Sequence, residues 1–290
     1  MIDNINLKYR IFKSKFIHIL VCVLAALTSV PLLAILGKVI FEGSKNFTWQ
    51  FLTEPTPTTY KAMLALAAGE SIPGGIANGI IGTILMLLMA VIIALPIGIM
   101  SGTFLAEKRG STIANIISYI TDMLQGTPSI IIGIIVYAWV VIPMKGYSAF
   151  AGGIALTIMM LPLIIRSTEE ALKLLPVSLK EASLALGGSY AKTVIKVLLP
   201  SAFGSIFTGV LLAVSRVVGE TAPLMFTALG CAAIQWQIDK PMASVPLLIW
   251  QFFNNPTLQP LVWSAALWLL IFVLILNITS KLIAKKWKIQ

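Results

Sequence analysis

The stretch EASLALGGSYAKTVIKVLLP, residues 181–200, is a polar segment that separates two strongly apolar runs of the chain. Gly187 and Gly188 divide it, because glycine adopts the left-handed conformation that follows a helix C-terminus at no steric cost. The stretch therefore predicts two short helices joined by a glycine hinge. Ser189 is positioned to cap the second helix, and Pro200 is expected to end it and to open the next apolar run.

The first of these helices is predicted to begin with a capping box after Pro176. Ser178-Leu179-Lys180-Glu181 has the S-x-x-E form, in which the serine caps the helix start and the glutamate reaches back to the serine amide. If Glu181 is occupied in this way, contact with a partner falls to a stripe of small and apolar side chains at helical spacing. The stripe consists of Leu179, Ala182, Ser183 and Leu186.

The composition of the whole chain is that of a membrane protein. Of its 290 residues 58% are hydrophobic and 11% are charged, with a mean hydropathy of +0.95. A soluble domain has about 25% charged residues, and apolar runs of about 20 residues are long enough to cross a bilayer as helices. We therefore predict an all-α polytopic membrane protein.

Six apolar runs are expected to cross the membrane. Residues 107–110 form a short charged turn between the second and third runs. The third run is interrupted by Asp122 and by Gly126-Thr127-Pro128. As a single helix it would be about 45 Å long, which is too long for a simple crossing. We therefore expect a bent-in or interfacial helix followed by a span over 129–142. Gly98 and Gly102, four apart in the second run, either allow close helix approach or have this spacing by chance in a glycine-rich span. The runs cover residues 16–41, 76–105, 113–142, 148–165, 201–234 and 261–283.

The basic residues orient these spans. Of the 21 lysines and arginines, fifteen fall in segments that face the cytoplasm if both termini are inside, five fall in outer segments, and Arg216 lies within an apolar run. The segment 176–199 is then a cytoplasmic loop. We divide the chain into an N-terminal span with an external loop (1–75), a transmembrane domain (76–284) and a basic cytoplasmic tail (285–290).

The chain lacks the usual signatures of an enzyme. The sequence has no cluster of metal ligands or of nucleophile and base, and no G-x-x-x-x-G-K-[ST] loop; Lys192-Thr193 follows Ala191 where that loop requires glycine. Cys22 and Cys231 lie in apolar surroundings without a C-x-x-C partner and are interpreted as packing residues. We predict a chain that binds no cofactor and does not hydrolyse ATP itself.

Arg216 and Glu220 are the charged residues of the fifth apolar run. Four residues apart, they are expected to share one helix face and to pair, which offsets part of the cost of about 2.5–3.5 kcal/mol of placing a charge at the bilayer centre. The alternatives are a self-satisfied pair or an arginine that extends to the outer interface. The functional reading is a buried guanidinium, held by its carboxylate, that donates bidentate hydrogen bonds to a tetrahedral oxyanion. Pro223 would bend or end the helix and free carbonyls to line a cavity.

Further charges lie near the inner end of the fourth run. Arg166, Glu169 and Glu170 are either interfacial charges in the headgroup region or, for Arg166, part of the same path. Asp122 either caps the break at Gly126 or faces an inner vestibule.

Glu181-Ala182-Ser183, followed by Gly187 and by Val197, Leu199 and Pro200, resembles the E-A-A…G…I-x-L-P loop of binding-protein-dependent ABC importer permeases with a MetI-like transmembrane domain. Ser183 stands where the loop usually has a second alanine. In that family the loop is a coupling helix that docks into a groove on a separate ATPase. The resemblance thus implies a coupling role for Leu179, Glu181, Ala182, Ser183, Leu186 and Gly187.

Three other segments narrow the resemblance. Residues 126–130 (GTPSI), 161–172 (LPLIIRSTEEAL) and 215–224 (SRVVGETAPL) are similar to those of the PstA family of phosphate permeases. The match covers roughly residues 72–230. It implies that Arg216 and Glu220 matter for phosphate passage, and we place Thr221 and Arg166 on the same candidate path.

The resemblance also implies a complete machine. This chain would be the inner-membrane permease subunit of an ATP-driven importer of inorganic phosphate, paired with a PstC-like second permease, two copies of a PstB-like ATPase that carries ATP and Mg, and an external PstS-like phosphate-binding protein. The residues alone leave other oxyanions, such as phosphonate or molybdate, as alternatives. A passive anion channel has no use for a docking loop, and an intramembrane enzyme using Glu220 lacks a second catalytic partner besides Arg216.

Overall fold

The computed structural model describes residues 2–287, and the side chains of residues 9–283. The regular elements in this part of the chain are helices. The expected basic tail, residues 285–290, lies outside the described side chains. The long helices are α1 (Ile2–Lys45), α4 (Ala77–Glu107), α5 (Thr112–Gly126), α8 (Ala149–Lys173), α11 (Leu199–Val218) and α14 (Gln259–Trp287). The short ones are α2 (Trp49–Thr53), α3 (Thr59–Ala68), α6 (Ser129–Val136), η1 (Tyr137–Val141), α7 (Ile142–Met144), α9 (Val177–Ala185), α10 (Tyr190–Thr193), η2 (Val194–Leu198), α12 (Ala222–Thr227) and α13 (Val245–Phe253).

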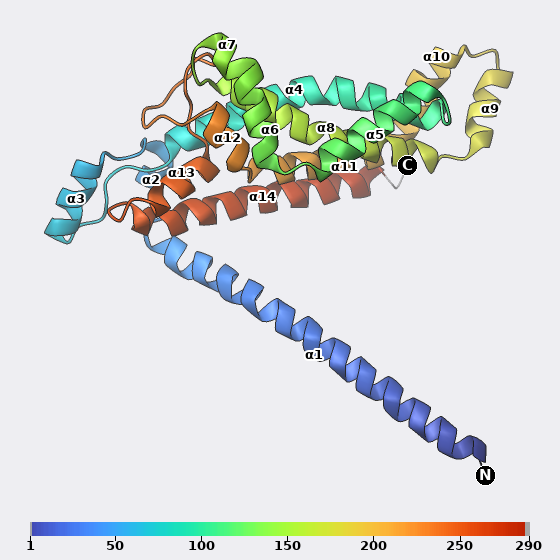
Figure 1. Ribbon diagram of the computed structural model, residues 1–290, viewed down its shortest axis with the longest axis horizontal. Coiled ribbons are helices and arrows are strands. Elements are labelled where there is room, and N and C mark those ends of the chain that lie inside the picture. The colour runs from blue at the N-terminus through green and yellow to red at the C-terminus, as the bar shows by residue number, and fades with distance from the viewer. Residues whose placement is uncertain (1, 288–290) are drawn as a thin grey trace.

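The body of the molecule is a bundle of long helices. In Figure 1, α4, α8, α11 and α14 run along the long axis, with α9 and α10 at one end and α2 and α3 at the other. Five helices are long and apolar enough to cross a membrane, and a bent pair, α5 with the helix over 129–144, brings the number to six. The all-α polytopic fold is therefore confirmed.

The third span is broken where the sequence predicted. Helix α5 ends at Gly126, α6 begins at Ser129, and the two halves meet at 108°. Thr127 and Pro128 form the break, because proline cannot continue the preceding helix and biases the residue before it away from helical conformation.

Close packing of α4 on α8 depends on two glycines. A Cβ atom on Gly98 would lie 2.5 Å from the Ile164 side chain, and one on Gly102 would lie 2.6 Å from the Ile165 carbonyl oxygen. Both distances are too short for any larger residue. The predicted role of Gly98 and Gly102 in close helix approach is confirmed.

Pro200 does not end the helix that precedes it, contrary to prediction. The helix continues through η2 into α11, and the span covers residues 190–218. The π-helical turn η2 lies directly before the proline, and η1 likewise precedes Pro143. A π-helical turn is one way for a helix to pass a residue that lacks an N–H donor and crowds the turn before it.

The segments between the spans at the α3 end carry more structure than the sequence predicted. The polar loop at 42–75 contains α2 and α3, and the last loop contains α13. Phe51 of α2 and Ala62 of α3 share a buried cluster with Val245 and Phe252 of α13. The side chain of Asn78 fastens the loops, because it donates to the Cys231 carbonyl at 2.7 Å and accepts from Thr56. These contacts join segments that are far apart in the sequence, so no local sequence pattern predicts them.

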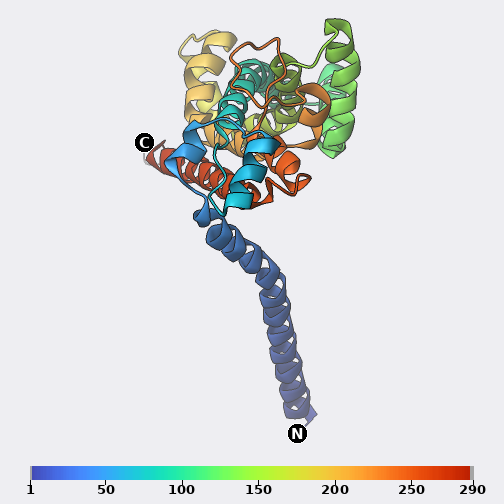
Figure 2. The same ribbon diagram turned by 90° about the vertical axis from the view of Figure 1, so that its left-hand side faces the viewer.

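Helix α1 diverges from the bundle. Its first half stands away from the other helices in both views (Figures 1 and 2), and its apolar side chains there are exposed. Its last turns pack on α14, where the Ser264 hydroxyl donates to the Gly43 carbonyl at 2.8 Å. Lys38 lies over the Trp263 ring at 5.0 Å. The start of α1 and the end of α14 both lie toward the α9 end in Figure 1.

Candidate functional site

Arg216 lies beside the break in the third span. A small cavity of about 10 Å³, about enough for one water molecule, is lined by Arg216 together with Gln125 and Thr127 from the break. Met159, Pro162 and Leu163, at the middle of α8, line its other side. These residues lie near the middle of α8, which is long and apolar enough to cross a membrane, so the cavity beside Arg216 lies between the two ends of that span. The Gly126-Thr127-Pro128 motif indicated only the break, and no local pattern indicated that Gln125 and Thr127 lie beside Arg216.

The predicted Arg216–Glu220 pair on one helix face is wrong. Helix α11 ends at Val218 with Gly219 at its C-cap, so Glu220 lies outside the helix, with its amide bonded to the Val217 carbonyl at 3.1 Å. Pro223 explains this end, because its ring clashes with the carbonyl four residues earlier, which belongs to Gly219. Among the described residues no ion pair joins Arg216 to Glu220. The Glu220 carboxylate instead lies within reach of the Ser129 side chain and of the Arg216 charge.

Two helix breaks thus face each other. Helix α6 packs on α12 so closely that a Cβ atom on Gly133 would lie 2.7 Å from Pro223 Cα. Neither Pro128, before α6, nor Thr221, before α12, makes a side-chain capping bond. The Ile131 amide bonds to the Pro128 carbonyl at 3.0 Å, so among the described residues the amides of Ser129 and Ile130 remain available at the start of α6. Amides at a helix N-terminus favour anions. Arg216 itself is exposed on the surface of the single chain.

Arg166 is the centre of an ion-pair network between α5 and α8. Its guanidinium binds Glu169 at 2.6 Å, Asp122, and the Ser118 hydroxyl at 2.8 Å, and Glu169 also binds Lys173. The Glu169 side chain is 8% exposed and lies inside the protein, whereas Glu170 is exposed. Asp122 pairs with Arg166 rather than capping the break.

The polar stretch forms the expected pair of helices, with one correction at its start. Helix α9 begins at Val177 with Pro176 at the N-cap and no side-chain capping bond, so the predicted capping box of Ser178 and Glu181 is wrong. Ser178 lies two positions beyond the N-cap, inside the helix, so it cannot serve as the cap. Ser189 occupies the N-cap of α10, but its side chain makes no capping bond.

The glycine hinge is confirmed. Gly187 has φ +80°, the left-handed conformation that glycine adopts without strain. Its amide bonds to the Leu184 carbonyl at 3.0 Å, and the Gly188 amide bonds to the Ser183 carbonyl at 3.1 Å. These two bonds close the end of α9 in the Schellman arrangement.

The two faces of α9 differ in their surroundings. Leu179 packs against the main core, and the Ser183 hydroxyl bonds to Thr193 of α10 at 2.9 Å. Glu181 and Ala182 are exposed, and Leu186 is 90% exposed. Of the six predicted docking residues, Leu179, Ser183 and the hinge residue Gly187 therefore hold the loop together, and the other three are exposed on its outer face.

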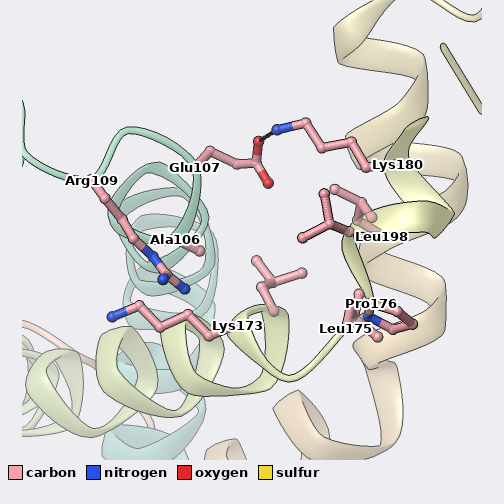
Figure 3. A pocket seen from close by; sticks show the side chains of 10 residues that line it. Ala106, Glu107, Arg109, Lys173, Leu175, Pro176, Lys180 and Leu198 are labelled. Carbon is pink, nitrogen blue, oxygen red and sulfur yellow. Dashed lines mark hydrogen bonds and ion pairs between the residues drawn. The ribbon is translucent and has the colours of Figure 1, made fainter.

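Glu107, which the sequence analysis placed only in a charged turn, ties this loop to α4. Its carboxylate accepts hydrogen bonds from Lys180 of α9 and, at 2.8 Å, from the Tyr190 hydroxyl of α10. The Lys180 ammonium also lies 5.3 Å from the centre of the Tyr190 ring. Figure 3 shows the bond from Lys180 to Glu107 across the root of the loop. One carboxylate at the end of a span thus holds both short helices.

The chain is similar in sequence to known proteins. Residues 94–289 match the family described as binding-protein-dependent transport system inner membrane component. The phosphate transport system permease protein PstA of Yersinia pestis is 38% identical over 260 residues, which cover 89% of this chain and 85% of the relative. PstA of Haemophilus influenzae is 40% identical over 251 residues, covering 86% and 85%.

A solved structure shares the fold. A chain from a structure titled "Inward facing conformations of the MetNI methionine ABC transporter" has a TM-score of 0.58 and 22% sequence identity, covering 72% of this chain and 93% of that one. Together with the family match, the broken third span and the cross-membrane helices, this places the protein in the inner membrane as a multi-pass component. The chain belongs to the family of binding-protein-dependent transport system inner membrane components and, within it, groups with the PstA permeases.

Proposed function

We propose that this chain is a permease subunit of an ATP-driven importer of inorganic phosphate. The observation that carries the proposal is the position of Arg216 at mid-membrane, beside two facing helix breaks, in a chain 38% identical to a PstA permease. An unpaired arginine at that depth is costly, and irregular backbone at membrane depth is tolerated where it is buried in protein or lines a water-filled cavity.

The candidate path begins at Arg216. A guanidinium offers two parallel N–H donors that match the oxygens of a tetrahedral oxyanion, and the uncapped start of α6 adds amide donors on the same side. Glu220, Ser129 and Thr221 stand at the rim of the two breaks. In this proposal Glu220 orients Arg216 and limits how long an anion remains bound, because a carboxylate repels phosphate.

Arg166 comes next toward the α9 end. It lies about one turn of α8 beyond the residues that face Arg216. Its guanidinium is already bound to two carboxylates. We propose that Arg166 forms part of an inner gate, whose ion pairs must rearrange for phosphate to pass, rather than a free binding group.

A second permease is needed to complete this site. Arg216 is exposed in the single chain although it lies at membrane depth, so another protein surface must shield it from lipid. We propose a PstC-like partner in a heterodimer, two copies of a PstB-like ATPase that holds ATP and Mg, and a PstS-like external binding protein. The chain itself would have no catalytic role.

The loop over 176–199 is proposed as the coupling element. Its outer face presents Glu181, Ala182 and Leu186 to the ATPase, while Leu179, Ser183 and Gly187 keep its shape. With this loop and both termini in the cytoplasm, residues 1–75 form a span and an external segment, and residues 76–284 form the permease domain. ATP hydrolysis would then move α9 and α10 as one body.

Transport of labelled phosphate tests the proposed function. Vesicles that contain the assembled complex should accumulate phosphate only when ATP and the external binding protein are both supplied. A tenfold excess of molybdate or of a phosphonate should leave this uptake unchanged, because the binding protein and path are expected to select phosphate. ATP-dependent accumulation of another oxyanion in place of phosphate would contradict the assignment, and uptake without ATP would indicate a channel.

Glu107→Gln is expected to uncouple ATP hydrolysis from transport. The amide removes the charge that attracts Lys180 but keeps an acceptor for Tyr190, so the loop should remain folded and attached more weakly to α4. A hydrogen bond to a charged group is worth about 1.5–3 kcal/mol. We expect the number of phosphate ions transported per ATP hydrolysed to fall several-fold, measured in the same vesicles.

The double variant Glu107→Lys with Lys180→Glu provides the control. It restores opposite charges at the two positions, so the number of phosphate ions transported per ATP should partly recover if this ion pair transmits the motion of α9 and α10. Glu54→Gln, at the far end of the fold, should leave the ratio unchanged. A Glu107→Gln complex with the normal ratio would remove Glu107 from the coupling path.

A further inference from the structure

A charged cavity lies at the root of the loop, outside the candidate path. It has a volume of about 320 Å³ and is bounded by the end of α4, the end of α8 and the first turn of α9 (Figure 3). This is within the lower range of small-ligand sites, which begins at about 300 Å³. Its polar lining residues are Glu107, Arg109, Lys173 and Lys180. The remainder of the wall is apolar and includes Leu172, Leu175 and Leu198.

The lining is electrostatically unbalanced. Three cationic side chains face it and one carboxylate, Glu107, which is already bound to Lys180. Lys173 binds Glu169, which is not part of the lining. Arg109 has no hydrogen bond or ion pair within the part of the chain that the structure describes. In Figure 3 the side chains of Arg109 and Lys173 converge at one side of the cavity.

Lys173 and Arg109, whose guanidinium has no ion-pair partner among the described residues, indicate which ligand the cavity would bind. Arginine and lysine together suit a phosphate-type oxyanion, since arginine supplies a planar pair of donors and lysine a compact charge. Basic pockets between transmembrane helices on the cytoplasmic side also bind the headgroups of anionic lipids. Both ligands present the same phosphate oxygens.

We propose that this cavity binds a phosphate-type oxyanion, either free inorganic phosphate or the headgroup of an anionic phospholipid. The ligand joins the ends of α4 and α8 to the start of α9, so its presence stiffens the root of the loop next to the Glu107 contacts. Binding does not depend on which ion the chain transports; only the cytoplasmic position of the cavity rests on the proposed orientation.

Arg109→Gln tests the site, with Lys108→Gln as its matched control. Both remove one positive charge from adjacent exposed residues of the same turn, but only Arg109 lines the cavity. The complex, free of nucleotide and binding protein, is placed in nanodiscs of neutral phosphatidylcholine, and binding of labelled inorganic phosphate is measured by equilibrium dialysis. In a second arm the nanodiscs contain phosphatidylglycerol, and native mass spectrometry counts the anionic lipids retained per complex.

The two arms distinguish the two sources of the ligand. If free phosphate is the ligand, Arg109→Gln weakens one class of phosphate binding about tenfold or more, as expected for one lost charge-assisted contact, while Lys108→Gln does not. If lipid is the ligand, Arg109→Gln loses retained phosphatidylglycerol that Lys108→Gln keeps. Equal behaviour of the two variants in both arms overturns the proposal. Gel filtration of both complexes verifies that each is assembled, and transport is not needed for either readout.

Discussion

Arg216→Gln is expected to reduce phosphate uptake by the assembled complex at least 100-fold. Arg216 is the cation at the two helix breaks, and glutamine keeps a polar side chain while it removes the charge and the paired donors. Each charge-assisted hydrogen bond is worth about 1.5–3 kcal/mol, so losing two of them costs roughly a factor of 100 or more. The measurement is the initial rate of labelled phosphate uptake in vesicles with a saturating concentration of the binding protein.

Two further variants separate the charge from its geometry. Arg216→Lys keeps the charge but loses the planar fork, so an intermediate rate is expected. Lys13→Gln removes a positive charge from an exposed position in the first half of α1, which stands away from the bundle, and should leave uptake close to that of the wild type. Full uptake by an assembled Arg216→Gln complex would exclude Arg216 from the path.

The sequence predicted those parts of the fold that depend on local chemistry. Apolar runs of sufficient length, the Gly126-Thr127-Pro128 break and the left-handed Gly187 follow from hydropathy, proline sterics and glycine conformation, and the structure confirms all three. The predictions that were wrong are those in which two local sequence rules competed at the same position. The S-x-x-E pattern at Ser178 suggested a cap, but Pro176 already begins the helix two residues earlier.

The site depended on contacts that no local pattern contains. Glu107 is 73 residues from Lys180 and 83 from Tyr190, so its turn looked like an ordinary charged end of a span. Arg216 and Glu220 looked like a helical pair because their spacing is four. The clash of Pro223 with the Gly219 carbonyl instead ended the helix between them. Proline acts upstream of its own position, and the prediction had placed the break after Glu220.

The ion-pair network around Arg166 should be worth more to folding than any other charged contact described above. Arg166→Gln leaves Glu169, which is 8% exposed, with Lys173 as its remaining ion-pair partner and leaves Asp122 without one. Removing one partner of a buried pair typically costs 3–5 kcal/mol, but Glu169 keeps Lys173 and the Asp122 side chain is 58% exposed, so the cost is smaller here. We therefore expect the stability to fall by about 1–2 kcal/mol, detected as a lower midpoint in thermal unfolding of the complex in detergent. Glu170→Gln also replaces a charged side chain with glutamine, but at an exposed position next to Glu169, and it should have almost no effect on stability.

The double variant Arg166→Gln with Glu169→Gln distinguishes a gate from a purely structural cluster. It also removes the Glu169 carboxylate, which is 8% exposed and has lost one of its two ion-pair partners, so part of the lost stability should return. If Arg166 belongs to the inner gate, uptake should remain low in this refolded variant, because the ion pairs that open and close are gone. If uptake returns together with stability, the network only holds α5 on α8, and phosphate passes from the Arg216 site to the cytoplasm without help from Arg166.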